Sequence, residues 1–197
     1  MKDQAFFSEG IYENKEFQGV PAAGRDVCRK EFSHCVFKGC DFGECRLNGS
    51  VFVDCVFSRC NLSCAKVDNC SFRDVVFDDC KLVNVVFTAV NPFLLNWTFR
   101  KCKIEQCNFG GLKMKRSRFL ESVVRGADFV NVDLESSDFS GSDLQDTRFH
   151  NAVLEKACFV GSRNYYLDPT ANKLKGARFS APEALALLAG FGVKVEY

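Results

Sequence analysis

The chain of 197 residues lacks several features that would place it in a familiar class. It has no apolar run near the roughly 18 residues of a membrane-spanning helix, and it does not begin with a secretion signal. Its 26 basic and 25 acidic residues leave a formal charge of +1, which excludes a polyanion or polycation. Phosphate-binding glycine loops, metalloprotease helices and nucleophile elbows are missing. We therefore expect a cytoplasmic protein that is no enzyme and needs no cofactor.

The sequence has instead a period of five residues. Large apolar residues occupy every fifth position from Cys35 to Phe57, and the same frame extends from Tyr12 to Phe87. The frame then slips by two residues and resumes from Phe99 to Phe179. Helices need apolar spacings of three and four, and strands need two, so this period indicates a structural repeat.

Units such as Ala127-Asp128-Phe129 and Ser142-Asp143-Leu144 resemble those of the pentapeptide-repeat family. The resemblance covers roughly residues 27–180. It implies an all-β fold, a right-handed quadrilateral β-solenoid, in which four units make one square turn and the apolar and small residues point inward. The sequence agrees with a twenty-residue turn, because residues that far apart share a type: Phe99, Phe119, Phe139, Phe159 and Phe179.

The chain is expected to form one elongated body with three parts. Residues 1–26 keep the frame weakly through Phe7, Tyr12 and Phe17, and we predict an N-terminal cap, with a recognition arm as the alternative. Residues 27–180 are the predicted solenoid, with a register break at 88–98. Residues 181–197 are predicted to close it.

The last segment has the pattern of a short α-helix followed by a strand. Ser180 and Glu183 have the spacing of a capping box, and Gly190 is predicted to end the helix. Val193, Val195 and Tyr197 alternate as in a strand. Both elements can cap the coil or pair with a second copy. We expect a homodimer through four apolar residues: Leu185, Leu188, Phe191 and Val193.

The twelve cysteines are predicted to be packing residues. Nine occupy the small inward position of the repeat: Cys35, Cys40, Cys45, Cys55, Cys60, Cys70, Cys80, Cys102 and Cys107. Free cysteine packs as a small hydrophobe. Paired C-x-x-C motifs are absent, so we expect no metal site, and unpaired thiols indicate a reducing compartment.

The register break is the first candidate binding site. Its sequence, TAVNPFLLNWT, contains the turn signal Asn91-Pro92. Loops on rigid scaffolds often carry recognition, so Asn91, Pro92, Phe93 and Leu94 are predicted to contact a partner. The alternative is a tolerated surface insertion in which Phe93, Leu94 or Trp97 folds back on the core.

A reversal of charge gives the second candidate. Residues 98–118 contain seven basic residues and Glu105, a balance of +6, whereas residues 121–147 contain seven acidic residues and Arg125, a balance of −6. In the acidic segment four aspartates recur at intervals of five, so they are predicted to girdle all four faces: Asp128, Asp133, Asp138 and Asp143. They either bind a partner or keep a β-surface soluble.

The tail Ala177–Tyr197 and the stretch Asn164–Asp168 resemble a narrower subset, the pentapeptide-repeat proteins that protect bacterial type II topoisomerases. The subset includes the quinolone-resistance (Qnr-type) proteins, the mycobacterial fluoroquinolone-resistance protein and the albicidin-resistance protein. The resemblance implies a dimeric rod that binds DNA gyrase or topoisomerase IV as a DNA mimic, without binding nucleic acid itself. The alternative is a generic β-solenoid scaffold for another protein.

Overall fold

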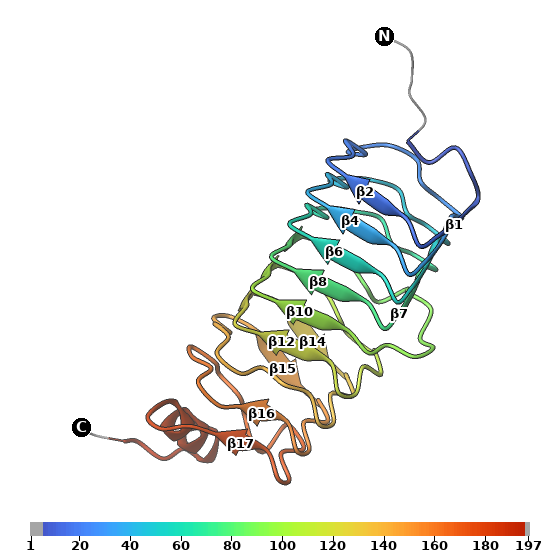
Figure 1. Ribbon diagram of the computed structural model, residues 1–197. Helices are drawn as coiled ribbons and strands as arrows, with labels where there is room; N and C mark the ends of the chain where they lie inside the picture. The colour runs from blue at the N-terminus through green and yellow to red at the C-terminus, as the bar shows by residue number, and fades with distance from the viewer. Residues whose placement is uncertain (1–5, 196–197) are drawn as a thin grey trace.

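The computed structural model describes residues 6–195, which form a rod with the chain ends at opposite tips (Figure 1). The backbone winds in square coils, and residues of neighbouring coils pair in parallel at a step of twenty, as in Phe37↔Phe57↔Phe77. The predicted quadrilateral β-solenoid is confirmed. No helix in the described part of the chain is long and apolar enough to span a membrane.

The strands stack on four faces. The first face holds β1 (Ile11–Glu13), β3 (Glu31–Ser33), β5 (Val51–Val53) and β7 (Ser71–Arg73). The second holds β2 (Glu16–Gln18), β4 (Val36–Lys38), β6 (Val56–Ser58), β8 (Val76–Asp78), β10 (Thr98–Arg100), β12 (Arg118–Leu120), and further on β16 (Cys158–Phe159) and β17 (Arg178–Phe179). The third holds β9 (Lys81–Val83), β11 (Lys103–Glu105) and β13 (Val123–Arg125), and the fourth holds β14 (Asp128–Val130) and β15 (Arg148–His150). Isolated bridges continue each face between these strands.

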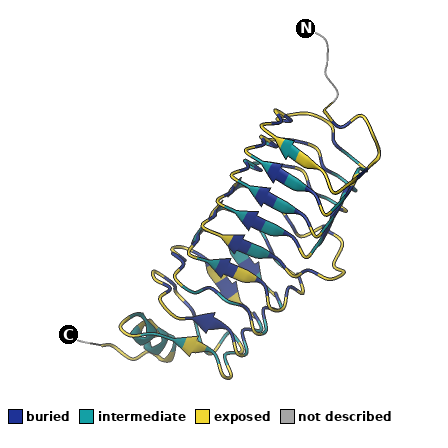
Figure 2. Ribbon diagram, viewed as in Figure 1, coloured by how far each residue is buried: buried dark blue, intermediate teal, exposed yellow. Residues whose placement is uncertain are grey.

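The five-residue unit explains this shape. In most three-residue strands the central residue is buried and the flanking residues face outward, as in β4 and β6 (Figure 2). The chain then turns at a corner residue with positive φ. On one edge Asn14, His34, Asp54 and Asp74 have φ between 49° and 53°. This left-handed conformation costs least for Gly, Asn and Asp, which is why these types recur at corners.

Stacked aromatic rings fill the core. Phe99, Phe119 and Phe139 lie nearly parallel, with ring centroids 4.9 Å apart at each step. All nine cysteines predicted to be inward are buried and free, which confirms their packing role. Their side chains fill the space beside the aromatic columns, where a larger residue would overpack.

The solenoid begins earlier than predicted. β1 pairs with β3 and β2 with β4, so residues from Ile11 onward already form a coil and the boundary at residue 27 is wrong. The five-residue frame continues through Val20–Gly24, where Ala22 takes the inward apolar position and is buried. Phe7 covers the open end, with its ring against those of Tyr12 and Phe32.

The register break is an insertion of two residues. The Asn91 N–H still donates to the Cys70 carbonyl (2.8 Å), a separation of 21 residues, whereas the Thr98 N–H donates to Val75 (3.1 Å), a separation of 23. The same hydrogen bond elsewhere, such as that from Asn61 to Cys40, spans 21 residues, so the two extra residues lie between Asn91 and Thr98. The five-residue pattern is also less regular at Asn164–Asn172, but this stretch stays in the coil, because Cys158 pairs with Arg178 at a step of twenty.

The last segment differs from its prediction in three ways. The helix η1 (Glu183–Phe191) is a 3-10 helix, and it ends at Gly192 with φ 72° in place of Gly190. Pro182 is the N-cap without a side-chain cap, because the Ser180 hydroxyl accepts a hydrogen bond from the Gly161 N–H (2.9 Å) and forms no capping box. Residues 193–195 form no strand, and Tyr197 lies outside the described residues.

Candidate partner-binding surfaces

The inserted loop exposes two adjacent apolar side chains. Phe93 is 61% exposed and Leu94 58% exposed, and Asn91 and Pro92 are exposed beside them. In the described chain these are the only two consecutive large apolar residues that are exposed. Of the three residues that the alternative places on the core, Trp97 does fold back, whereas Phe93 and Leu94 do not. Water-exposed apolar pairs on a polar wall are typical of contact sites.

The loop is anchored at both ends. Trp97 is fully buried, and its indole Nε1–H donates to the Phe72 carbonyl at 2.9 Å. The Asn91 side chain accepts the Phe93 N–H (3.1 Å), and the Asn96 amide donates to Asp74 (3.0 Å). Trp97 thus takes the inward position in this coil, and Phe93 and Leu94 lie outside the core. The tip is held in place before any partner arrives.

The four aspartates of the acidic segment encircle the rod as predicted, one on each face. Bridges connect Asp128, Asp133, Asp138 and Asp143 with residues of the preceding coil. Each accepts a hydrogen bond from the backbone N–H two residues later, at 2.9 to 3.3 Å. These contacts shape the turns.

Most of these carboxylates are also paired with cations from neighbouring coils. Asp128 pairs with Arg148 (3.3 Å) and Asp133 with Lys115 (3.4 Å). Asp143 is only 2% exposed and contacts Arg125 and Asn164. Burial raises the pKa of Asp143, but hydrogen bonds from Asn164 and Arg125 outweigh it and hold the pKa below its usual value. The girdle is therefore largely neutralised within the protein.

The basic segment retains charge that the acidic segment does not cancel. Lys115 donates to Glu135 (2.7 Å), which raises the pKa of Lys115 and lowers that of Glu135. Lys113, Arg116 and Arg118 are exposed and have no ion pair within residues 6–195. Arg118 lies beside Thr98 of the loop, since β10 pairs with β12.

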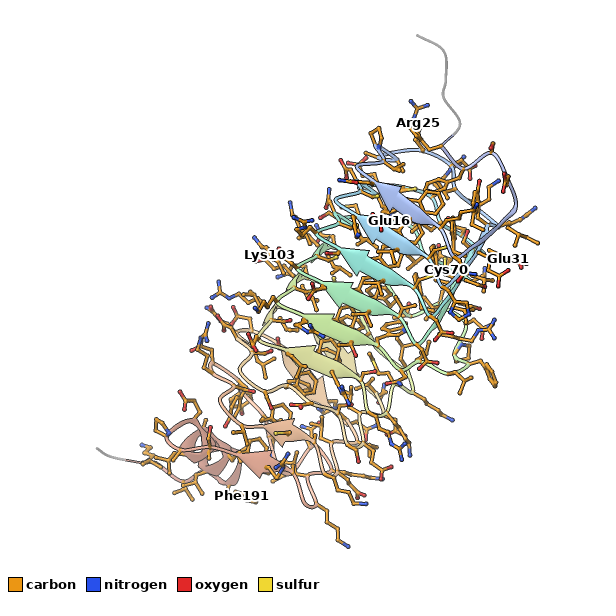
Figure 3. All side chains as sticks on the ribbon, viewed as in Figure 1. Glu16, Arg25, Glu31, Cys70, Lys103 and Phe191 are labelled. Atoms are coloured by element: carbon orange, nitrogen blue, oxygen red, sulfur yellow. The ribbon has the colours of Figure 1, made fainter. Side chains whose placement is uncertain are left out.

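The C-terminal end presents a second apolar surface. Leu187 of η1 packs on the last coil, so the helix closes the core. Phe191, labelled beside η1 in Figure 3, is 62% exposed, and Val193 is 49% exposed. Leu185 and Leu188 are half-buried. Leu185 and Val193 also line a shallow groove with Ala186 and Ala189.

Comparison with known families matches two models along the coil. The model described as a pentapeptide repeat region covers residues 91–159, and the model of pentapeptide repeats in nine copies covers residues 32–76. Together they span both sides of the register break. The chain belongs to the pentapeptide-repeat family.

Solved pentapeptide-repeat structures share this fold. A trypsin-treated variant of QnrB1, a plasmid-mediated fluoroquinolone resistance protein, superposes with a TM-score of 0.72 at 19% identity, covering 95% of this chain and 97% of its own. Full-length QnrB1 superposes with a TM-score of 0.60 at 19% identity, and the match covers 93% of this chain and 100% of QnrB1. HetL is involved in heterocyst differentiation regulation in the cyanobacterium Nostoc. It superposes with a TM-score of 0.62 at 15% identity, and the match covers 85% of this chain and 84% of HetL. No curated protein matches the sequence.

Within this pentapeptide-repeat rod the predicted site residues do not form one surface. The loop lies at the first face and its corner, while Asp128 and Asp143 lie on the fourth and third faces. Sequence reasoning noted the positive balance of residues 98–118 but assigned no role to Lys113, Arg116 and Arg118. The twenty-residue step, which places Arg118 beside Thr98 and Lys115 beside Glu135, was the signal that could have identified them.

Proposed function

We propose that this pentapeptide-repeat protein binds a bacterial type II topoisomerase, DNA gyrase or topoisomerase IV, and protects it from poisons such as fluoroquinolones. The observation that carries the proposal is a rod that matches QnrB1 over nearly its whole length and bears an anchored, exposed Phe93–Leu94 tip. The resemblance of the tail Ala177–Tyr197 to the topoisomerase-protecting subset supports it.

Protection by binding needs no catalytic group. A rod can compete with DNA for the enzyme, or it can dock on the complex of enzyme, DNA and drug so that the drug leaves and the DNA is resealed. Ion pairs cover Asp128, Asp133 and Asp143, so the girdle offers few free charges with which to imitate a phosphate backbone. This favours docking on the complex over DNA mimicry.

The same proposal includes a cytoplasmic homodimer joined at its C-terminal ends, without direct nucleic-acid binding and without catalysis. Exposed Phe191 and Val193 support the dimer, because apolar side chains at a rod end gain from burial against a second copy.

Supercoiling by purified gyrase, poisoned with a fluoroquinolone, tests the function. Titrating in this protein should restore supercoiled product in proportion to its concentration. The comparison is the variant Phe93→Ser with Leu94→Ser, which changes only exposed side chains. It should restore less supercoiled product than the wild type at the same concentration. Substitution is preferable to deletion of the loop, because Val90 and Leu95 are buried and their removal would damage the core.

A generic scaffold for another protein is the second candidate. The likeness to HetL favours it, because that solenoid has a comparable TM-score and is described as involved in heterocyst differentiation regulation. Absence of rescue with several poisons, together with no binding to gyrase or topoisomerase IV, would favour the scaffold.

A further inference from the structure

Three cations without an ion pair follow the exposed loop at the next coil step. Lys113, Arg116 and Arg118 are exposed and unpaired in the described chain, and Arg116 and Arg118 come one coil step of twenty residues after Asn96 and Thr98. The loop itself, residues 88–98, contains no charged residue. The apolar tip and the three cations thus form one continuous surface, which we call the tip-and-cation surface.

Acidic groups nearby form no ion pair with these three cations in the described chain. Asp74 accepts the Asn96 amide at 3.0 Å, and Asp133 and Glu135 are engaged by Lys115 at 3.4 and 2.7 Å. Asp138 follows Arg118 in the next coil, where its carboxylate accepts the Ser140 N–H and hydroxyl. Asp74 and Asp138 keep their charge, but no ion pair in the described residues joins them to these three cations, which stay available to a partner next to the apolar tip.

We propose that the tip-and-cation surface docks on an acidic protein surface of the topoisomerase, where carboxylates surround an apolar pocket that receives Phe93 and Leu94. This inference rests on the proposed function and names the chemistry of the partner's site. Buried apolar anchors supply most of the affinity of an interface, and surrounding charges set its orientation and specificity. The anchoring of the loop by Trp97 reduces the entropy lost on docking.

The partner surface inferred here differs from a DNA-binding groove. Such grooves are basic and would repel Lys113, Arg116 and Arg118. Nucleic acid also fits the surface poorly, because a duplex needs a longer row of cations to follow its phosphates. Here the three cations are flanked by Asp74, Glu135 and Asp138. A compact carboxylate patch on a protein matches the size of this cluster.

Charge reversal with a matched control tests the proposal. The test variant carries Lys113→Glu, Arg116→Glu and Arg118→Glu. The control carries Arg59→Glu, Lys66→Glu and Lys81→Glu, which reverse three cations that have no ion pair in the described residues and lie away from the loop, and which change the net charge equally. Glutamate fits the corner at Arg116 (φ 62°), because Glu44 and Glu121 adopt the same conformation. A third variant with glutamine at 113, 116 and 118 serves if the test variant fails to fold.

Binding to purified gyrase and topoisomerase IV is measured at several NaCl concentrations. We expect the test variant to bind at least about tenfold more weakly and the control within about threefold of wild type. The glutamine variant should lose most of the salt dependence of wild type. An equal loss in the control, or unchanged affinity in the test variant, would overturn the inference while leaving the proposed function intact.

Two further outcomes separate the remaining possibilities. If wild type binds a fluorescent DNA duplex at the same concentrations and the test variant does not, the surface binds nucleic acid and the inference is wrong. If wild type binds neither topoisomerase and rescues neither enzyme, the proposed function fails and this inference fails with it.

Discussion

Ser50 and Cys70 follow one another in a single column of the core and make the same contacts. The Ser50 hydroxyl donates to the Val27 carbonyl at 2.8 Å, and the Cys70 thiol donates to the Leu47 carbonyl at 2.9 Å. Cys70 is labelled in Figure 3. Serine and cysteine are thus interchangeable as small inward donors, and burial raises the pKa of the Cys70 thiol to about 12.

Thiol labelling of the native protein tests this packing role. We expect rapid labelling of at most Cys28 and Cys64, which are half-buried, and slow labelling of the ten buried cysteines. Unfolded protein without reductant should label all twelve. Fewer than twelve would indicate disulfides and contradict the account.

Stability should also fall at high pH. The thiol pKa rises from 9.0 to about 12 for Cys45, Cys55, Cys70 and Cys107, mainly because of burial. Below pH 9 the thiols are neutral in the folded and the unfolded chain. Between pH 9 and 12 only the unfolded chain ionises, so the free energy of unfolding decreases. Urea unfolding at several pH values between 9 and 12 measures this decrease in the free energy of unfolding. The decrease should be smaller in the variant Cys70→Ser.

Asp143 should contribute stability at neutral pH. The pKa of Asp143 is lower in the folded protein than its ordinary value of 3.8. The stabilisation is therefore present above pH 3.8 and is lost as the pH falls through the pKa of the folded protein. Replacing Asp143 with Asn should therefore cost about 1–2 kcal/mol at pH 7, because charge-assisted hydrogen bonds to Arg125 are lost. The difference from wild type should shrink in acid. Asp146→Asn, at an exposed position of the same coil, is the control and should change little.

Among the secondary-structure elements, the sequence pattern predicted the strands of the repeat but not the details of η1 and the inserted loop. Every strand column followed from the five-residue period, because a regular period fixes which residue points inward. The type and ends of η1 did not follow, because Ser180 is also a repeat position and its hydroxyl binds the Gly161 N–H. The sequence left open which of Phe93, Leu94 and Trp97 folds back on the core, because that choice depends on how the inserted residues pack against the coil.

The C-terminal element is proposed to join two copies. Changing Phe191 and Val193 to Asp should give a folded monomer, because both side chains are exposed and only the dimer would bury them. Leu187→Asp should instead destabilise the last coil, against which Leu187 packs. Sedimentation equilibrium distinguishes these results. Val160→Asp changes another exposed apolar residue and should leave the dimer intact. If the variant at 191 and 193 remained a dimer, the interface would lie elsewhere.

For the whole molecule, the twenty-residue step determines both the core and the charge pattern. It places Lys115 beside Glu135 and Arg148 beside Asp128, so coils of opposite charge neutralise one another. Charges counted along the sequence suggested an acidic girdle available to a partner, but pairing between coils removes most of it. The apolar tip and the cations beside it are not covered by this pairing.

Cleavage of DNA by gyrase in the presence of a fluoroquinolone tests the central claim most directly. The drug traps cleaved complexes, which are counted as linear DNA after denaturation, while this protein is titrated in. The account predicts that linear DNA decreases as the protein concentration rises and that supercoiling recovers in parallel. A constant amount of linear DNA at every concentration, with gyrase and with topoisomerase IV alike, would contradict the account.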